Sequence, residues 1–409
     1  MAPGVFVLGG AQTDFSRHLA REGTGLAEIT GEIVDRTLEA AKLDVGAIQA
    51  IHVGNAFGEL FTGQAQLGAM PATARPLLWG VPASRHEAAC ASGSVAILAA
   101  MADIESGRYD CVLVLGIEQE RNVPGEIAAR HLGAAAWVGH EGETARYLWP
   151  HMFSRIGDAY EERWGLRAEH LTAIAKKNLR NARVNPLAQT RAWSWDAGTF
   201  GDATANPQVE GRLRRYDCAQ VTDGAAAVVL ASQKLAEAHA RQTGVPIARI
   251  SGWGHRTAAL GLDAKLLRTA ERTSSLMPHL AQTVSDALRR ADLPGVLALD
   301  GVEVHDCFTV TEYLAIDHLG VTAPGDAWKA IESGMLEKTG ELPINPSGGL
   351  IGGGHPVGAT GVRMLVDAAH QVTGTAGPCQ IDGASTFGTL NIGGSGTTAV
   401  CLIVAGSLA

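Results

Sequence analysis

The sequence predicts an α/β layered fold built from two similar halves. Strand-like and helix-like patterns alternate along the chain, which is typical of helices packed against a β-sheet. A short internal repeat indicates that this alternation occurs twice. A long irregular segment of different character separates the two regular regions, so we expect an insertion between them.

The elements of the first half follow from hydrophobic periodicity. An apolar strand pattern at Val5–Leu8 ends in two glycines, and apolar residues at helical spacing predict a helix over Leu26–Ala41. A second strand is predicted at Ala50–Val53. Ser92–Ile104 is apolar almost all round, which predicts a buried helix, and Tyr109–Leu115 predicts a buried strand.

The internal repeat pairs Thr37–Phe57 with Ala287–Phe308, and a single one-residue insertion aligns their matching residues. Because the match is short, a chance resemblance is the alternative. As a true repeat it predicts one half starting near residue 4 and another starting near residue 248. Strands at Ala226–Leu230 and Ala399–Val404 would close the two halves.

Between the halves, Glu118–Arg215 holds most of the tryptophans and a polar helix at Ala168–Asn181. An insertion of this length is usually functional, so we expect it to cover a substrate. The predicted organisation is therefore an N-terminal half of residues 1–117 and 216–247, a loop domain of residues 118–215, and a C-terminal half of residues 248–409.

Composition excludes several classes of protein. The chain has 409 residues, 46% hydrophobic and 18% charged, with a net charge of −9 and no Lys/Arg run, so no nucleic-acid partner is expected. No signal peptide and no apolar run of about 18–20 residues is visible, which predicts a cytoplasmic protein without a membrane span. The six cysteines form no CxxC pair, so we expect free thiols and no metal.

Cys90 lies in the segment His86–Ser94, where small residues lead into the predicted buried helix. A cysteine at a helix N-terminus faces free backbone N–H groups and the positive end of the helix dipole, and both lower the thiol pKa. Small neighbours allow a thioester to approach closely. The alternative is a structural cysteine on a packed helix.

A glycine-rich loop at Asn345–Gly361 carries His355. Its glycines predict no regular structure before Pro356, with His355 at the start of a helix that runs through Met364 and Ala368. An imidazole beside a nucleophilic thiol can take its proton and polarise a thioester carbonyl. A phosphate-binding loop is the weaker alternative, because no GKS/T or GxGxxG motif is present.

Two further segments carry reactive groups. His305 and Cys307 follow the predicted strand Val302–Val304, at the sheet edge where α/β folds usually place their sites. Asn391 and Gly393 belong to a predicted glycine turn that could aim N–H groups at an oxyanion. For both segments a purely structural role is the alternative.

These four segments, in this order, resemble those of the thiolase superfamily over essentially the whole chain. The surroundings of Cys90 and the NPSGGLIGGGHPVGATG run are the specific parts. The resemblance implies two βαβαβαββ halves in a five-layered αβαβα core, with the inserted segment as a loop domain that holds coenzyme A. It also implies a homodimer or homotetramer.

The resemblance assigns roles to individual residues. Cys90 would be the acylated nucleophile, and His355 would activate it and contribute to a first oxyanion hole. The N–H groups of Cys90 and Gly393 would form a second oxyanion hole. The residues expected to contact coenzyme A are Thr222, Asp223, Gly224 and Gly354.

The chain departs from the commonest thiolase pattern at two places. Asn391, in the oxyanion turn, stands where those enzymes carry a second catalytic cysteine, and an amide has no useful pKa for proton transfer. His305-Asp306-Cys307-Phe308 replaces an Asn-Glu-Ala-Phe tetrapeptide. This pattern resembles the sterol-carrier-protein-linked thiolases, which implies that Cys307 is the acid/base and that His305 holds the water of the first oxyanion hole.

The expected activity is that of an acyl-CoA C-acyltransferase in lipid metabolism, such as fatty acid degradation. It would cleave 3-oxoacyl-CoA with coenzyme A, or condense two acyl-CoA molecules, through an acyl-Cys90 intermediate. Acyl-CoA is then a substrate, and no permanently bound cofactor is expected. The alternatives are a thiolase-fold retro-aldol lyase, a scaffold acting with an OB-fold partner protein, and a non-catalytic lipid- or acyl-carrier-binding module.

The sequence offers four cations in the inserted segment for the phosphates of coenzyme A, with a solvated helix face as the equally good alternative. They are Lys176, Lys177, Arg180 and Arg183.

Overall fold

The computed structural model describes residues 4–196, 198–272 and 275–406. Nine strands are hydrogen bonded in the order β3-β2-β4-β7-β1-β8-β11-β10-β9, and a separate two-stranded ribbon pairs β5 with β6. The strands of the large sheet are β1 (Val5–Gln12), β2 (Ala50–Gly54), β3 (Ala83–His86), β4 (Cys111–Glu118), β7 (Gly224–Ser232), β8 (Ala248–Thr257), β9 (Gly301–Val304), β10 (Thr386–Gly393) and β11 (Thr398–Gly406). The ribbon strands are β5 (Gln208–Glu210) and β6 (Leu213–Arg214).

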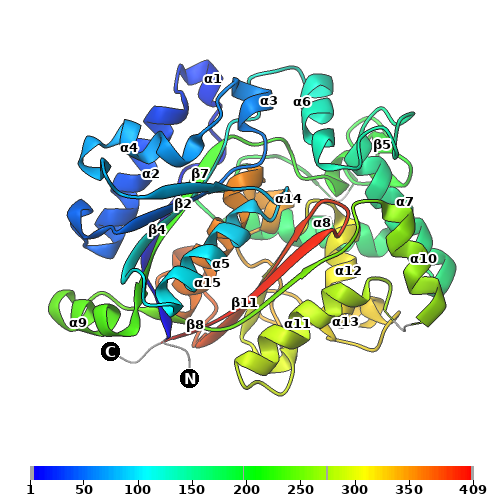
Figure 1. Cartoon of the computed structure of the whole chain (residues 1–409). Coiled ribbons are helices and arrows are strands. Elements are labelled where there is room, and N and C mark those ends of the chain that lie inside the picture. The colour runs from blue at the N-terminus through cyan, green and yellow to red at the C-terminus, as the bar shows by residue number, and fades with distance from the viewer. Residues whose placement is uncertain (1–3, 197, 273–274, 407–409) are drawn as a thin grey trace.

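Helices surround and separate the strands (Figure 1). In the first half they are α1 (Leu19–Glu22), α2 (Leu26–Ala41), α3 (Gly58–Thr62), α4 (Met70–Ala74), α5 (Ser92–Glu105) and α9 (Gln233–Thr243). Between β4 and β7 lie α6 (Gly125–Leu132), α7 (Leu148–Trp164) and α8 (Ala168–Ala182). The second half contains α10 (Leu262–Arg272), α11 (Pro278–Arg290), α12 (Thr309–Leu319), α13 (Ala327–Ser333), α14 (Gly349–Gly353) and α15 (Thr360–Val372).

The elements stack in five layers, α-β-α-β-α, as the sequence predicted. Helices α2 and α9 cover the outer face of the N-terminal strands, and α11 covers β8 and β11 on the opposite side. Helices α5 and α15 lie between the two parts of the sheet and contact each other. Because both faces of α5 are buried, its sequence is apolar all round and shows little amphipathic pattern.

The two halves repeat one another in space. The halves meet where β1 pairs with β8. Outward from this pair, the N-terminal order β1-β7-β4-β2-β3 corresponds to the C-terminal order β8-β11-β10-β9. The counterpart of β3 is reduced to an isolated parallel bridge between Ile344 and Val302. The repeated segments Thr37–Phe57 and Ala287–Phe308 span equivalent places, from α2 into β2 and from α11 into β9.

Glycines set the spacing of the central layer. A Cβ on Gly93 of α5 would lie 2.8 Å from the Gly358 carbonyl oxygen, and a Cβ on Gly358 would lie 2.7 Å from the Gly54 oxygen. No side chain fits at either contact, so the backbones of the two halves touch directly. This contact lies close to the segments that carry Cys90 and His355.

Three sequence predictions about the glycine-rich segments were wrong. Residues Gly349–Gly353 form the short helix α14, because the Asp306 carboxylate accepts the N–H groups of Leu350 and Ile351 at its start. Helix α15 begins at Thr360, so His355 precedes the helix and does not start it. Likewise, Asn391 and Gly393 belong to the end of strand β10, and the turn follows them.

Among the described residues, no helix combines the length and the apolar character that crossing a bilayer requires.

Candidate active site

Cys90 lies in a tight turn between β3 and α5. Ala89 has a left-handed backbone with φ of 50°, an arrangement that is uncommon for a residue with a side chain. Ser92 closes the turn, since its hydroxyl accepts the Ala88 N–H and donates to the Ala89 carbonyl. The turn therefore fixes the direction of the Cys90 side chain before the helix begins.

Burial governs the acidity of this thiol. Burial, and after it the charge of Glu120, raise the pKa of Cys90 to about 12 against the opposite effect of the N–H groups of Gly394 and Cys90 itself. The sequence-based prediction of a lowered pKa was therefore wrong. In the resting protein the group is a neutral thiol that needs a base.

His355 is held by two contacts in the loop between α14 and α15. Its backbone N–H is donated to the Thr222 hydroxyl at 2.8 Å, and its ring Nδ1 lies 2.7 Å from the Thr360 hydroxyl oxygen. Thr360 uses its own proton for the Pro356 carbonyl, so its oxygen must accept from Nδ1–H. His355 Nε2 is consequently the ring nitrogen with a free lone pair.

His305 takes the opposite tautomer. Its Nδ1 lies 3.1 Å from the Asn391 amide nitrogen, and the Asn391 amide oxygen accepts from the Ser94 hydroxyl at 2.9 Å. The amide nitrogen thus donates to Nδ1, which leaves the ring proton on Nε2. The sequence showed that Asn391 replaces a cysteine, but nothing in it indicated that Ser94 orients the Asn391 amide.

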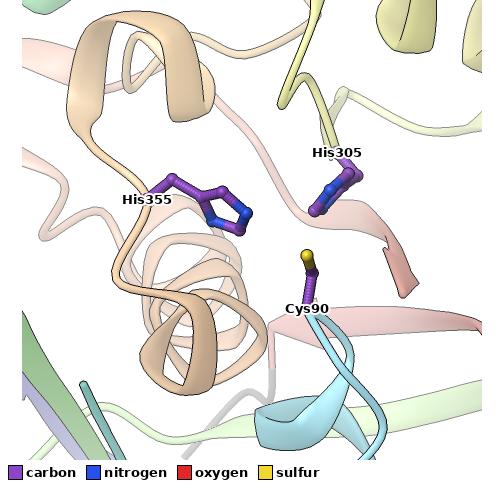
Figure 2. Close-up of side chains that lie close together, drawn as sticks. All are labelled: Cys90, His305 and His355. Atoms are coloured by element: carbon purple, nitrogen blue, oxygen red, sulfur yellow. The ribbon is translucent and has the colours of Figure 1, made fainter. Parts of the chain in front are cut away.

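The two imidazoles and the thiol converge. Figure 2 shows the Cys90 sulfur pointing toward both rings, and one ligand atom from each of Cys90, His305 and His355 lies within 4.8 Å of the others. The rings meet edge to face with centroids 5.2 Å apart. Burial lowers the pKa of His355 to about 3 and that of His305 well below its usual value, with the Arg363 charge contributing in the same direction. Both rings are therefore neutral near pH 7.

A thiolate and two imidazoles are also the donor types that bind zinc. Ligation through His305 Nε2 would require the ring proton to move to Nδ1, where it would face the donating Asn391 amide. The hydrogen bonding of Asn391 therefore favours an N–H donor in this position over a metal ligand.

Cys307 lies in the same cavity as Cys90. Its sulfur is 3.4 Å from the Thr311 hydroxyl, and its pKa is raised well above the usual value by burial and then by the Cys90 charge. Cys307 is thus a neutral thiol, and a negative charge on Cys90 would further disfavour its ionisation.

Gly393 and Gly394 differ in their relation to the nucleophile. A Cβ on Gly393 would lie 2.2 Å from the Ala88 carbonyl oxygen, so a glycine is required where β10 passes the Cys90 turn. The N–H group that reaches the Cys90 thiol belongs to Gly394, one residue beyond the glycine chosen from the sequence.

The residues expected to contact coenzyme A hold neighbouring segments of the site in place. Asp223 is fully buried and accepts the N–H groups of Leu19, Glu120 and Arg121. Thr222 holds His355, and glycine is needed at 224 and 354 because a Cβ there would contact Phe15. None of Thr222, Asp223, Gly224 and Gly354 lines the cavity in front of Cys90, and their contact with coenzyme A stays a prediction.

The cavity in front of Cys90 has a volume of about 480 Å³. Its wall includes Cys307, His355, Phe308, Trp149 and Phe153, together with two arginines, Arg146 and Arg215. Helix α7 and the segments on either side of it thus contribute one wall, which places part of the inserted segment over the thiol.

The four cations chosen from the sequence lie elsewhere. Lys177 is buried in an ion pair with Glu312, and Arg180 pairs with Glu337. Arg183 stacks on Trp195 and Lys176 on Phe200. None of them lines the cavity, whereas the exposed Arg146 and Arg215 do, and neither stood out in the sequence.

Two family models match this chain: the thiolase N-terminal domain over residues 5–190 and a thiolase C-terminal domain-like model over residues 264–406. The acetyl-CoA acetyltransferase of Methanothermobacter thermautotrophicus is 33% identical over 372 residues, which cover 90% of each chain. The chain belongs to the thiolase family.

The chain is also similar to a further curated protein and to a solved structure. Human sterol carrier protein 2 is 28% identical over 421 residues, covering 97% of this chain and 71% of that protein. The solved structure of the Ltp2-ChsH2(DUF35) aldolase has a TM-score of 0.78 at 21% identity and covers 99% of this chain and 98% of that one, which shows the shared fold. As a member of the family, the chain is an acyltransferase enzyme of the thiolase type that acts on acyl-CoA.

Proposed function

We propose that the chain carries the acyl group as a thioester on Cys90, and that its two histidines divide proton acceptance and oxyanion stabilisation between them. The observation that supports this is the convergence of one thiol with two imidazoles of opposite tautomer. His355 offers a lone pair that can take the thiol proton. His305 offers an N–H that can donate to a thioester oxygen.

In the degradative direction the Cys90 sulfur bonds to C3 of a 3-oxoacyl-CoA as its proton passes to His355 Nε2. Negative charge develops on the C3 oxygen, where the N–H groups of Cys90 and Gly394 are available. The C2–C3 bond then breaks, and C2 of the leaving acyl-CoA takes a proton from the Cys307 thiol.

The second half of the reaction restores the groups. Cys307 takes the proton of an incoming coenzyme A thiol, whose sulfur attacks the acyl-Cys90 carbonyl. Cys90 leaves and recovers its proton from His355. In the condensing direction the same steps run backwards, with Cys307 removing the α-proton of the second acyl-CoA.

The raised pKa of Cys90 and the lowered pKa of His355 fit a proton transfer that accompanies bond formation. Cys90 and His355 form a neutral pair at pH 7, because the thiol pKa lies near 12 and the imidazole pKa near 3. Attack on the carbonyl and loss of the thiol proton therefore occur together, which is general-base catalysis.

We further propose that residues 118–215 act as the loop domain that covers acyl-CoA. Arg146 and Arg215 at the cavity are the candidates for its phosphates, and the aromatic wall at Trp149 and Phe153 would contact the pantetheine or acyl chain. A role in fatty acid degradation, a homodimeric or homotetrameric assembly and a cytoplasmic location are parts of the same proposal. An OB-fold partner is also proposed, and the similar Ltp2-ChsH2(DUF35) aldolase, whose name includes a DUF35 component, makes that partner worth testing.

The test is intact mass after incubation with acetyl-CoA, followed by thiolysis of acetoacetyl-CoA. Wild type gains one acetyl group, and Cys90→Ala gains none. Cys307→Ala still reaches one acetyl group, but more slowly, because it lacks the proton donor for the leaving coenzyme A sulfur. Its thiolysis falls by about 10²–10⁴-fold, because the acid/base is missing from both half-reactions. Acetylation of Cys90→Ala equal to that of wild type contradicts the nucleophile assignment. Full thiolysis by Cys307→Ala contradicts the acid/base assignment, whereas absence of thiolysis in wild type would favour the lyase or scaffold alternatives.

A further inference from the structure

Glu120 is a buried carboxyl group that the proposed reaction does not use. It follows strand β4, is 1% exposed, and lines the same cavity as Cys90 and Cys307. A negative charge on Glu120 would raise the pKa of the Cys90 thiol, which lines the same cavity. Its Oε1 has no hydrogen-bond partner among the described residues.

The neighbouring carboxylates are in a different situation. Glu118 accepts the Asn55 amide and the N–H groups of Ala56, Phe57 and Gly358. Asp223 likewise accepts three backbone N–H groups. These two residues fill structural roles, whereas Glu120 is turned toward the cavity with part of its hydrogen-bonding capacity unused.

The surroundings of Glu120 favour its neutral form. Burial raises its pKa well above the usual value, and the charges of Glu118 and Asp223 raise it further, against the weaker effect of the Val357 and Thr222 N–H groups. A neutral carboxylic acid has one O–H to donate and lone pairs to accept. The walls of the cavity are largely apolar, and they include Phe57, Trp149, Phe153 and Phe308.

We propose that Glu120 selects acyl groups that carry an oxygen, as a hydroxyl or a carbonyl, within the first few carbons of the thioester attached to Cys90. Such an oxygen supplies the partner that the buried carboxyl lacks. A plain alkyl chain would leave the carboxyl unpaired in a desolvated pocket, which costs binding. The inference rests on the proposed acyl-Cys90 intermediate and narrows its substrate class to oxygenated acyl-CoA thioesters.

The experiment measures acylation of Cys90 by intact mass over time, with butyryl-CoA and 3-hydroxybutyryl-CoA as a matched pair. Wild type is expected to react with 3-hydroxybutyryl-CoA at least tenfold faster. Glu120→Gln keeps a donor and an acceptor and should keep most of that preference. Glu120→Leu removes both and should bring the ratio of the two rates to one or reverse it.

The outcomes separate the inference from the function on which it rests. Absence of a Cys90 adduct with either thioester in wild type overturns the proposed function. Adducts that form at equal rates in wild type, or a preference that survives in Glu120→Leu, overturn the selection by Glu120. Equal rates in wild type overturn the inference even if Glu120→Leu does not fold.

Discussion

Replacing Thr360 with valine tests whether the tautomer of His355 controls acyl transfer. The Thr360 hydroxyl accepts the Nδ1–H of His355 at 2.7 Å and donates to the Pro356 carbonyl at 3.0 Å, and the residue is fully buried. Valine has nearly the same shape but cannot accept. In the variant the Nδ1–H faces a methyl group, while the alternative tautomer places its proton on Nε2, toward Cys90.

The size of the effect follows from the cost of that unpaired donor. A buried donor without a partner costs about 1–3 kcal/mol, and that cost falls on the tautomer that can accept the thiol proton. At about 1.36 kcal/mol per factor of ten, the competent population and the acylation rate should fall by roughly 5- to 150-fold. Thr360→Ser keeps the hydroxyl and should stay within about threefold of wild type.

The assay is the single-turnover rate of Cys90 acetylation by acetyl-CoA, with circular dichroism to establish that each variant is folded. A folded Thr360→Val that acylates as fast as Thr360→Ser would refute the tautomer assignment. Selectively ¹⁵N-labelled histidine provides a second readout, because the wild-type ring of His355 should carry its proton on Nδ1 and that of His305 on Nε2.

Two further predictions concern the nucleophile turn. Because burial raises the pKa of Cys90 to about 12, the thiolate fraction increases with pH, so alkylation by iodoacetamide should accelerate about tenfold per unit from pH 7 to 10; a plateau below pH 9 would contradict the raised pKa. Gly393→Ala should lower Cys90 acylation by about 10²-fold, because its Cβ would lie 2.2 Å from the Ala88 oxygen and displace the turn. Gly295→Ala is the matched control, since a Cβ at that position meets nothing within 4 Å, and equal losses in both variants would exclude this steric cause.

The layered fold was predictable because its strands and helices leave strong local patterns. Leu26–Ala41 is amphipathic, which indicates a helix buried on one side. Cys111–Ile117 is continuously apolar, which indicates a strand buried on both sides. The short helix at Gly349–Gly353 left no such pattern, since its start is stabilised by Asp306 from a distant part of the chain.

The candidate site was predictable in its reactive groups but not in the residues that control them. Cys90, His305, Cys307 and His355 carry chemistry that can be recognised in a sequence. The acidity of Cys90 could not be read in the same way, because burial by the folded chain outweighs the local effect of nearby backbone N–H groups.

The supporting residues were missed for a related reason. Ser94, Thr360 and Gly394 act through single hydrogen bonds, and Arg146 and Arg215 reach the cavity only through the path of the inserted segment. One sequence feature indicated Glu120. Glu118 and Glu120 are separated by a single residue at the end of a buried strand.

The backbone contact at Gly93 and Gly358 has a consequence for how activity is lost on unfolding and regained on refolding. Cys90 comes from the first half of the chain, whereas His305, Cys307 and His355 come from the second, and the halves meet there without intervening side chains. Neither half holds a working fragment of the catalyst. A displacement of one half from the other would therefore abolish acylation without unfolding either half. Recovery of activity on refolding requires the halves to dock as well as their helices and strands to form.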